Sequence, residues 1–92
     1  MNMPKWAIEF SKDAEKDLAR LDKEVRRRII DKLEWLSANF DSLLPFPLTG
    51  EFREFYKFRV GDWRIFYSIN WTNHIINIEY IGHRNKSYKK EQ

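Results

Sequence analysis

Residues 56–67 have the sequence Tyr-Lys-Phe-Arg-Val-Gly-Asp-Trp-Arg-Ile-Phe-Tyr, and this stretch decides the fold. The pair Gly61-Asp62 is typical of a two-residue turn, so the segment is predicted to form a β-hairpin. The predicted pairs are Val60 with Trp63, Arg59 with Arg64 and Phe58 with Ile65. Because side chains alternate across a strand, one face of this hairpin is expected to be apolar. That face would carry Tyr56, Phe58, Val60, Trp63, Ile65 and Tyr67.

The opposite face of the hairpin is expected to be basic. It carries Lys57, Arg59 and Arg64, with Phe66 among them. Like charges directly opposite one another weaken a sheet, so the two facing arginines do not help the fold. Arginine side chains bind phosphate oxygens through paired hydrogen bonds. The pairing therefore predicts that this face binds an anion, either a phosphate or an acidic partner.

Length and composition indicate one globular domain. A chain of 92 residues has room for one hydrophobic core, so a single domain is predicted over residues 1–92. Hydrophobic residues make up 42% and aromatic residues 16%, which favours a compact protein over a disordered chain. The net charge of +3 arises in the second half, because residues 51–92 hold eight basic and five acidic side chains while residues 1–50 hold nine of each. A basic half favours nucleic acid or an acidic protein as partner.

Several classes of site are excluded by residue type. Cysteine is absent, which rules out disulfides, thiol catalysis and Cys-based metal sites. His74 and His83 are too few and too far apart in sequence to suggest a metal site, and we expect no cofactor. No apolar run approaches the roughly 20 residues that a membrane helix needs. The N-terminal residues also lack the apolar core of a signal peptide. We therefore expect a soluble cytoplasmic protein without membrane partners.

The first half of the chain predicts one strand and two helices. Residues 5–10 alternate as a strand, and Ser11 is a good N-cap for a helix over residues 12–21. A second helix is predicted over residues 23–39, with an apolar stripe at intervals of three and four residues. That stripe consists of Val25, Ile29, Leu33, Leu36 and Phe40. The two helices are expected to form an antiparallel hairpin.

The second half predicts a loop and three strands. Residues 41–50 contain two prolines and a glycine and are expected to form a loop. The central hairpin follows, and a turn at Thr72-Asn73 leads to a last strand that ends near Gly82. In that strand Ile76, Ile78 and Tyr80 are expected to face the core. The order β-α-α-β-β-β predicts an α+β domain, in which an antiparallel sheet carries the helical hairpin on one face.

The predicted register of the last strand extends the basic face. It places Arg64 beside Ile81 and Phe66 beside Glu79. One interpretation is a solvated surface on which Glu79 forms an ion pair with Arg64, since exposed charges are usual in small proteins. That interpretation leaves unexplained the facing arginines and the two phenylalanines expected to be exposed on this face, Phe55 and Phe66.

The functional interpretation is a surface that binds and cleaves RNA. Cleavage needs no metal when the ribose 2′-OH attacks the neighbouring phosphate, but it requires a base, cations for the developing charge and an acid. Lys57 is the candidate base, because the neighbouring arginines disfavour its charged form and should lower its pKa. The candidate catalytic residues are Lys57, Arg59, Arg64, Arg84 and Tyr88, with the arginines as electrostatic stabilisers and the tyrosine orienting or stacking on the nucleotide. The candidate RNA-binding residues are Phe66, His83 and Lys86, and His83 is either the acid or an ordinary polar residue.

At these residues the sequence resembles the RelE/ParE superfamily of bacterial and archaeal toxins of type II toxin–antitoxin modules. The resemblance covers nearly the whole chain. It is carried by Ile8-Glu9-Phe10 with Ser11 and Ala14, by Leu48-Thr49-Gly50, by residues 56–67, and by Ile81-Gly82-His83-Arg84 followed by Tyr88. The resemblance implies the same α+β fold.

The two branches of this superfamily imply different activities. The RelE branch cleaves mRNA in the ribosomal A site without a metal, and its functional residues fall here on Lys57, Arg59, Arg64, Arg84 and Tyr88. The ParE branch inhibits DNA gyrase, has no nuclease activity and does not need this basic set. The basic set favours a ribosome-dependent endoribonuclease, with a gyrase inhibitor as the alternative and a non-toxic binding module as a third possibility.

The resemblance also implies partners. Both branches are neutralised by a cognate antitoxin whose acidic or amphipathic segment wraps the toxin, which suits a basic face with exposed rings. A RelE-like toxin would also contact mRNA and the small ribosomal subunit. Operator DNA would be contacted only through the antitoxin complex.

Overall fold

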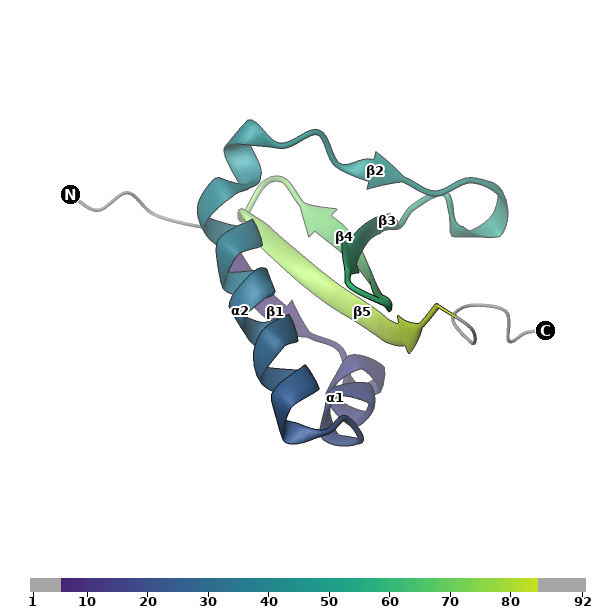
Figure 1. Cartoon of the computed structure of the whole chain (residues 1–92). Helices are drawn as coiled ribbons and strands as arrows, with labels where there is room; N and C mark the ends of the chain where they lie inside the picture. Colours follow the sequence, from purple (N-terminus) through teal and green to yellow (C-terminus); the bar gives the residue numbers. More distant parts are fainter. Residues whose placement is uncertain (1–5, 85–92) are drawn as a thin grey trace.

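The structure is a computed structural model that describes residues 6–84. It has an α+β fold in which a five-stranded sheet is covered on one face by a long helix (Figure 1). The strands are β1 (Ala7–Phe10), β2 (Phe46–Pro47), β3 (Tyr56–Val60), β4 (Trp63–Asn70) and β5 (Ile75–His83). The helices are α1 (Lys12–Ala19) and α2 (Lys23–Asn39), and η1 (Phe40–Ser42) and η2 (Gly50–Phe52) are short 3-10 turns. The predicted fold class is confirmed.

The sheet is mixed, with strand order β1-β5-β4-β3-β2. We expected antiparallel strands throughout, but β1 lies parallel to β5, with Ile8 beside Ile76 and Phe10 beside Ile78. The alternation of residues predicts which side of a strand faces the core, but it does not predict the direction of a neighbour that is distant in sequence. The predicted loop over residues 41–50 also contains β2, which pairs with the start of β3.

The core lies between α2 and one face of the sheet. From α2 it receives the predicted stripe, of which Ile29 and Leu36 are completely buried. The apolar face of the β3–β4 hairpin meets this stripe as predicted, because Val60, Ile65 and Tyr67 are buried. The alternating side chains of the hairpin were therefore assigned to the correct faces of the sheet.

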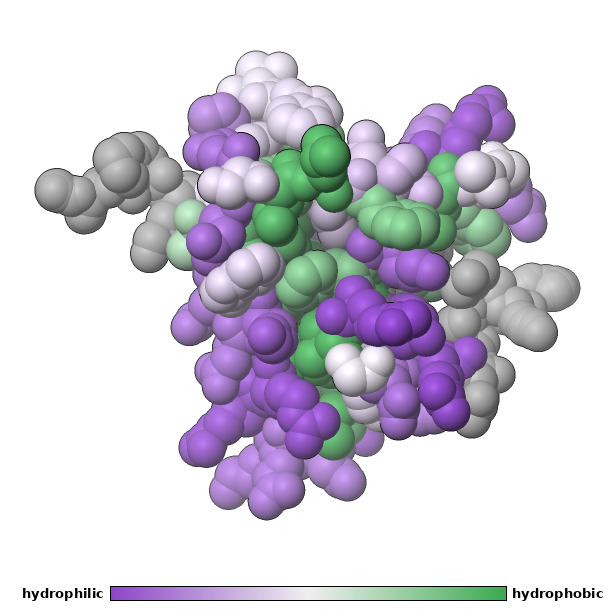
Figure 2. Space-filling view, turned by 45° about the horizontal axis from the view of Figure 1, so that its top comes forward, coloured by the Kyte–Doolittle hydropathy of each residue, from purple (hydrophilic) through white to green (hydrophobic). Residues whose placement is uncertain are grey.

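The core does not cover all the apolar side chains. Figure 2 shows a band of apolar surface with hydrophilic side chains on both sides of it. The exposed large hydrophobic residues include Leu44 (93% exposed), Phe46 (62%) and Trp35 (45%). The Trp35 ring stacks on Phe58 of β3, with ring centroids 6.4 Å apart and an interplanar angle of 9°. An apolar surface of this kind is typical of a binding site for a partner.

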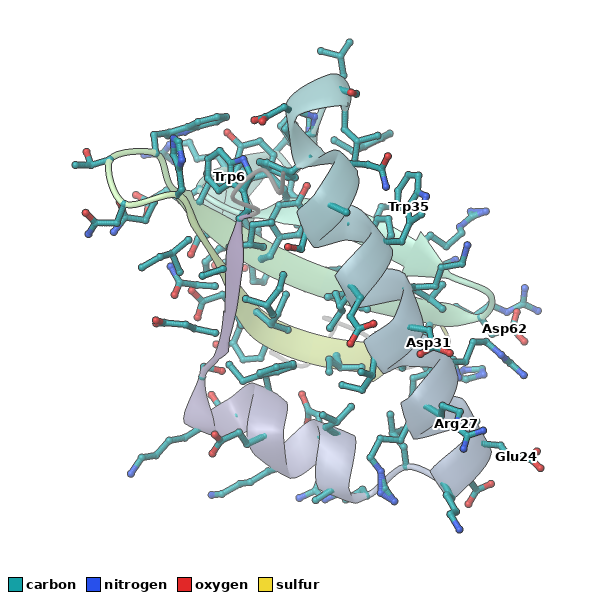
Figure 3. The ribbon with its side chains drawn as sticks, turned by 90° about the vertical axis from the view of Figure 1, so that its left-hand side faces the viewer. Trp6, Glu24, Arg27, Asp31, Trp35 and Asp62 are labelled. Atoms are coloured by element: carbon teal, nitrogen blue, oxygen red, sulfur yellow. The ribbon has the colours of Figure 1, made fainter. Side chains whose placement is uncertain are left out.

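The two helices form an open V rather than the close antiparallel hairpin that we expected (Figure 3). The shorter helix, α1, packs mainly on β5, while α2 crosses the sheet. Glu24, Arg27, Asp31 and Trp35 follow one side of α2, and Asp62 marks the tip of the β3–β4 hairpin. The helix hairpin therefore has little interface of its own, and its position depends on the sheet.

Hydrogen bonds from Ser11 link the start of α1 to β5. Its backbone N–H donates to the carbonyl of Ile78 (2.9 Å), and its hydroxyl donates to the carbonyl of Glu79 (2.8 Å). The same hydroxyl accepts from the N–H of Ala14 (2.9 Å), which makes Ser11 the predicted N-cap. In a regular strand consecutive carbonyls point to opposite edges, so two of them bonded to one residue indicate an irregular strand.

The irregularity is a β-bulge in β5. Tyr67 pairs with Ile78, but Phe66 pairs with Tyr80, so Glu79 is the extra residue. The predicted neighbours of Arg64 and Phe66 were therefore wrong by one position. The bulge also reverses the expected burial, because Ile81 lies in the core (5% exposed) whereas Tyr80 faces outward (42% exposed).

Ser11→Ala should lower the free energy of unfolding by about 1–2 kcal/mol, because it removes the N-cap of α1 and a bond to the bulge. Urea denaturation would measure this effect. Ser11→Asp is the matched control, since aspartate is a good N-cap but cannot donate to the carbonyl of Glu79. A stability of Ser11→Ala equal to that of the original protein would show that Ser11 does not hold the bulge.

Candidate functional site on the outer face of the sheet

The basic residues of the hairpin lie on the sheet face opposite the core. Arg59 and Arg64 are directly opposite one another across β3 and β4, as predicted. The turn between them is of type II′, in which the first central residue has a positive φ, and Gly61 has φ of 60°. Cβ atoms of facing residues are separated by about 5 Å, so the two positive side chains start close together.

Arg64 extends toward the hairpin turn. Its Nη1 donates to the carbonyls of Gly61 (3.4 Å) and Trp63 (3.5 Å), and both bonds are long and therefore weak. Gly82 lies opposite Arg64 on β5 and adds no side chain to this part of the face. The guanidinium group is thus held only loosely and can turn toward an anion.

Arg84 joins the same end of the sheet. Its backbone N–H donates to the carbonyl of Asp62 (2.8 Å), and its Nη1 lies 3.7 Å from the Asp62 carboxylate. Both side chains of this ion pair are more than half exposed, so the pair is a weak competitor for another anion. The structure thus brings together three of the predicted catalytic residues, Arg59, Arg64 and Arg84.

The ion pair between Glu79 and Arg64, which belonged to the interpretation of a solvated surface, is not formed in residues 6–84. The Glu79 carboxylate instead accepts from the hydroxyl of Ser68, at 2.8 Å. Because Glu79 is the bulge residue, its side chain is set back along the strand from Arg64. The acidic side chain that was expected to neutralise this arginine is therefore engaged elsewhere.

Lys57 lies at the other end of the basic face. It is partly buried, and its Nζ lies 5.2 Å from the centre of the Phe46 ring on β2. Such a contact between an ammonium group and an aromatic ring is attractive. Lys57 precedes Arg59 by two residues and shares its face of the sheet. Its role as the base stays a prediction.

Two predicted RNA-binding residues are placed differently from our expectation. Phe66 is on the outer face, but it is only 3% exposed, so its ring is not available for stacking. His83 pairs with Trp63, and the two rings contact edge to face at 5.1 Å. Since Trp63 belongs to the core side of the sheet, His83 lies on that side and away from the arginines. Lys86 and Tyr88 lie outside the described residues.

Of the aromatic residues beside the basic face, Phe55 was expected there, whereas Phe52 and Tyr80 were missed by sequence reasoning. The Phe55 ring contacts Tyr80 edge to face at 6.2 Å, and Phe52 lies 6.2 Å from Phe55. These three residues are not part of the main core. Tyr80 was missed because the bulge that turns it outward cannot be recognised from alternation alone.

Tyr67 lies on the core side of the same hairpin. It is 2% exposed, and its ring stacks on Tyr56 at a centroid distance of 5.6 Å. Burial, and secondarily the neighbouring Tyr56, raises the pKa of Tyr67 to about 12 from its ordinary value of 10.0. The unfolded chain thus loses this proton at lower pH than the folded protein does.

The stability of the protein should fall between pH 10 and pH 12 because of Tyr67. In this range the unfolded state binds fewer protons than the folded state, so the free energy of unfolding decreases as the pH rises. The full effect of a shift of about two pKa units is roughly 2–3 kcal/mol. Chemical denaturation from pH 8 to pH 12 would detect it as a difference between the original protein and Tyr67→Phe. Parallel pH profiles of the two proteins would contradict this assignment.

Residues 6–84 bring together no three His, Asp or Glu side chains that could hold a metal ion. Within the same range, neither helix has the length and apolar character to cross a membrane.

Comparison with known proteins identifies the family. A family model described as the ParE toxin of the type II toxin–antitoxin system, parDE, matches residues 8–88. The chain belongs to this toxin family. The resemblance to the RelE/ParE superfamily is confirmed. No curated protein matches the sequence at a significant level.

Solved structures of RelE toxins have the same fold as this ParE-family chain. A chain of the RelBE2 toxin–antitoxin complex from Mycobacterium tuberculosis aligns with a TM-score of 0.79 and 23% identity, covering 90% of this chain and 95% of the other. The RelE–RelB complex from Pyrococcus horikoshii aligns at 0.68 and 25% identity, covering 89% and 98%. The RelB–RelE complex from Methanococcus jannaschii aligns at 0.68 and 26% identity, covering 91% and 99%.

Proposed function

We propose that this toxin is a metal-independent endoribonuclease that cleaves mRNA in the ribosomal A site. The observation that carries the proposal is that Arg59 and Arg64 face one another on the outer sheet face, with Arg84 beside the hairpin turn at the same end of the sheet. The ion pair with Asp62 at this end is weak, and the Glu79 carboxylate is bonded to Ser68. Such a group of cations suits the charge that develops on phosphate during cleavage.

The proposed reaction is an internal transfer of the phosphodiester. The ribose 2′-oxygen attacks the adjacent phosphorus, and the bond from phosphorus to the 5′-oxygen breaks. The products are a 2′,3′-cyclic phosphate and a free 5′-hydroxyl. Lys57 accepts the 2′-proton, and an acid supplies the proton that the 5′-oxygen takes up. The arginines stabilise the pentavalent phosphorane, since arginine retains its charge throughout.

Purified toxin added to programmed ribosomes tests the proposal. The mRNA should be cut at the A-site codon, with a cyclic phosphate at the new 3′ end. Mapping the ends of the fragments identifies both the position and the chemistry. Intact mRNA under these conditions would contradict the proposed activity.

A second candidate function is inhibition of DNA gyrase, and the match to the ParE family model favours it. In that case the toxin would block DNA supercoiling, and growth arrest would survive replacement of Lys57 and Arg64. A supercoiling assay with purified gyrase distinguishes the two activities. We favour RNA cleavage because gyrase inhibition leaves the facing Arg59 and Arg64 without a role.

We further infer that a cognate antitoxin binds this chain. Three of the similar structures are complexes of RelE with RelB. The exposed apolar residues Trp35, Leu44 and Phe46 suit an amphipathic segment, and the basic face suits an acidic one. The free toxin then acts in the cytoplasm on mRNA at the small ribosomal subunit, and it contacts operator DNA only through the antitoxin.

A further inference from the structure

We propose that Tyr80 forms a stacking platform for one nucleobase of the RNA substrate, beside the arginines that hold its phosphate. The inference rests on the proposed function for the identity of the ligand. It assigns a new residue to the site, because the sequence alone placed Tyr80 in the core.

The bulge in β5 creates the platform. Without the extra residue Glu79, Tyr80 would point toward α2, but the shift between Phe66 and Tyr67 turns it to the outer face. Ser11 holds this arrangement through its two bonds to β5. An aromatic ring that the fold turns toward solvent, at 42% exposure, is available to a ligand.

The ring is supported from one side. Phe55 meets Tyr80 edge to face, with centroids 6.2 Å apart and an interplanar angle of 75°. Phe52 in turn supports Phe55 at 6.2 Å. Such contacts limit the rotation of the tyrosine side chain, so less conformational entropy is lost when a base stacks on it.

The position of Tyr80 relative to the arginines fits a single nucleotide. Across the sheet, Lys57, Phe66 and Tyr80 form one row, and Arg59, Arg64 and Gly82 form the next row on the same face. Rows two residues apart along a strand are separated by about 7 Å. A phosphate bound by Arg64 therefore places its own or the adjacent base over the row that contains Tyr80.

Bases stack on aromatic side chains through their π faces, so Tyr80 should tolerate every base and contribute mainly to binding. The hydroxyl group is not needed for this role. These two properties separate stacking from proton transfer, because Tyr80→Phe keeps the ring whereas Tyr80→Ala removes it.

Binding of an RNA that cannot be cleaved tests the platform directly. A fluorescent 2′-O-methyl oligoribonucleotide lacks the attacking hydroxyl, and its Kd for the full chain is measured by fluorescence anisotropy. Tyr80→Ala should raise this Kd by about 5- to 150-fold, and Tyr80→Phe should leave it within about twofold. Trp71→Ala is the matched control, because Trp71 is also an exposed aromatic residue (59%) but lies in the turn between β4 and β5.

Cleavage on programmed ribosomes supplies a second readout. Tyr80→Ala should raise KM with little change in kcat, a separation that a general loss of structure would not produce. Unchanged Kd and KM for Tyr80→Ala, or an equal loss in Trp71→Ala, would overturn the platform. Absence of cleavage by the original protein would overturn the proposed function instead, and the anisotropy measurement would still decide for or against the platform.

Discussion

Replacing Arg64 with alanine should lower the rate of A-site mRNA cleavage by about 10²–10³-fold. This is the usual effect of removing one preorganised hydrogen-bond donor to an oxygen that becomes negatively charged in the transition state. Arg64 is central to the basic group, because Arg59 faces it across the hairpin. Its own hydrogen bonds to Gly61 and Trp63 are long, so the folded protein should tolerate the change. The measurement is the single-turnover cleavage rate on programmed ribosomes, and Arg84→Ala should behave similarly.

Two variants make this prediction specific. Arg64→Lys keeps the charge but loses the paired donors of the guanidinium group, so its cleavage rate should lie between those of the original protein and Arg64→Ala. Arg27→Ala removes the same charge from α2, which covers the other face of the sheet (Figure 3), and it should cleave normally. A similar loss in Arg27→Ala would indicate a general effect of net charge. Undiminished cleavage by Arg64→Ala would contradict the role of the basic face.

The central hairpin could be predicted from sequence because the residues that determine it are close together in the chain. A two-residue turn with glycine at the position of positive φ fixes the register, and alternation then assigns each side chain to a face. This reasoning placed Arg59 opposite Arg64 and Tyr67 in the core correctly. Helix α2 could be predicted equally well from the sequence, because its apolar residues recur with the helical period.

The last strand shows where such reasoning fails. Its bulge accepts a hydrogen bond from Ser11, which lies 68 residues before Glu79 in the chain, and no local sequence pattern predicts that contact. One extra residue reverses the faces of all residues after it, so Tyr80 was assigned to the wrong side. The site was therefore predicted well on β3 and β4 and poorly on β5.

The burial of Phe66 and the side of the sheet on which His83 lies could not be predicted, for related reasons. Phe66 was assigned to the correct face of the sheet. A side chain on a mostly polar face can nevertheless be buried by its neighbours, as Phe66 is. His83 follows the bulge, so its side of the sheet could not be obtained by counting from the turn. Burial and register between distant elements are properties of the whole fold, and a single sequence does not specify them locally.

Ile78→Ala should cause the largest loss of stability, about 2–5 kcal/mol, because it leaves a cavity in the hydrophobic core under the central strands. Ile78 is completely buried and lies between Phe10 of β1 and Tyr67 of β4. Its carbonyl also accepts the N–H of Ser11, immediately before the bulge. For a domain of this size the loss corresponds to a fall in Tm of roughly 10–30 °C, which calorimetry would measure.

The matched control for this cavity is Ile78→Val, which removes one methylene and should cost only about 0.5–1.5 kcal/mol. Ile75→Ala at the start of β5 should also cost less than Ile78→Ala, since Ile75 is only partly buried. Equal losses at Ile75 and Ile78 would contradict the assignment of the core to the centre of β5. If Ile78→Ala folds, its weaker packing before the bulge should also loosen Tyr80, so RNA binding should fall more than in Ile75→Ala.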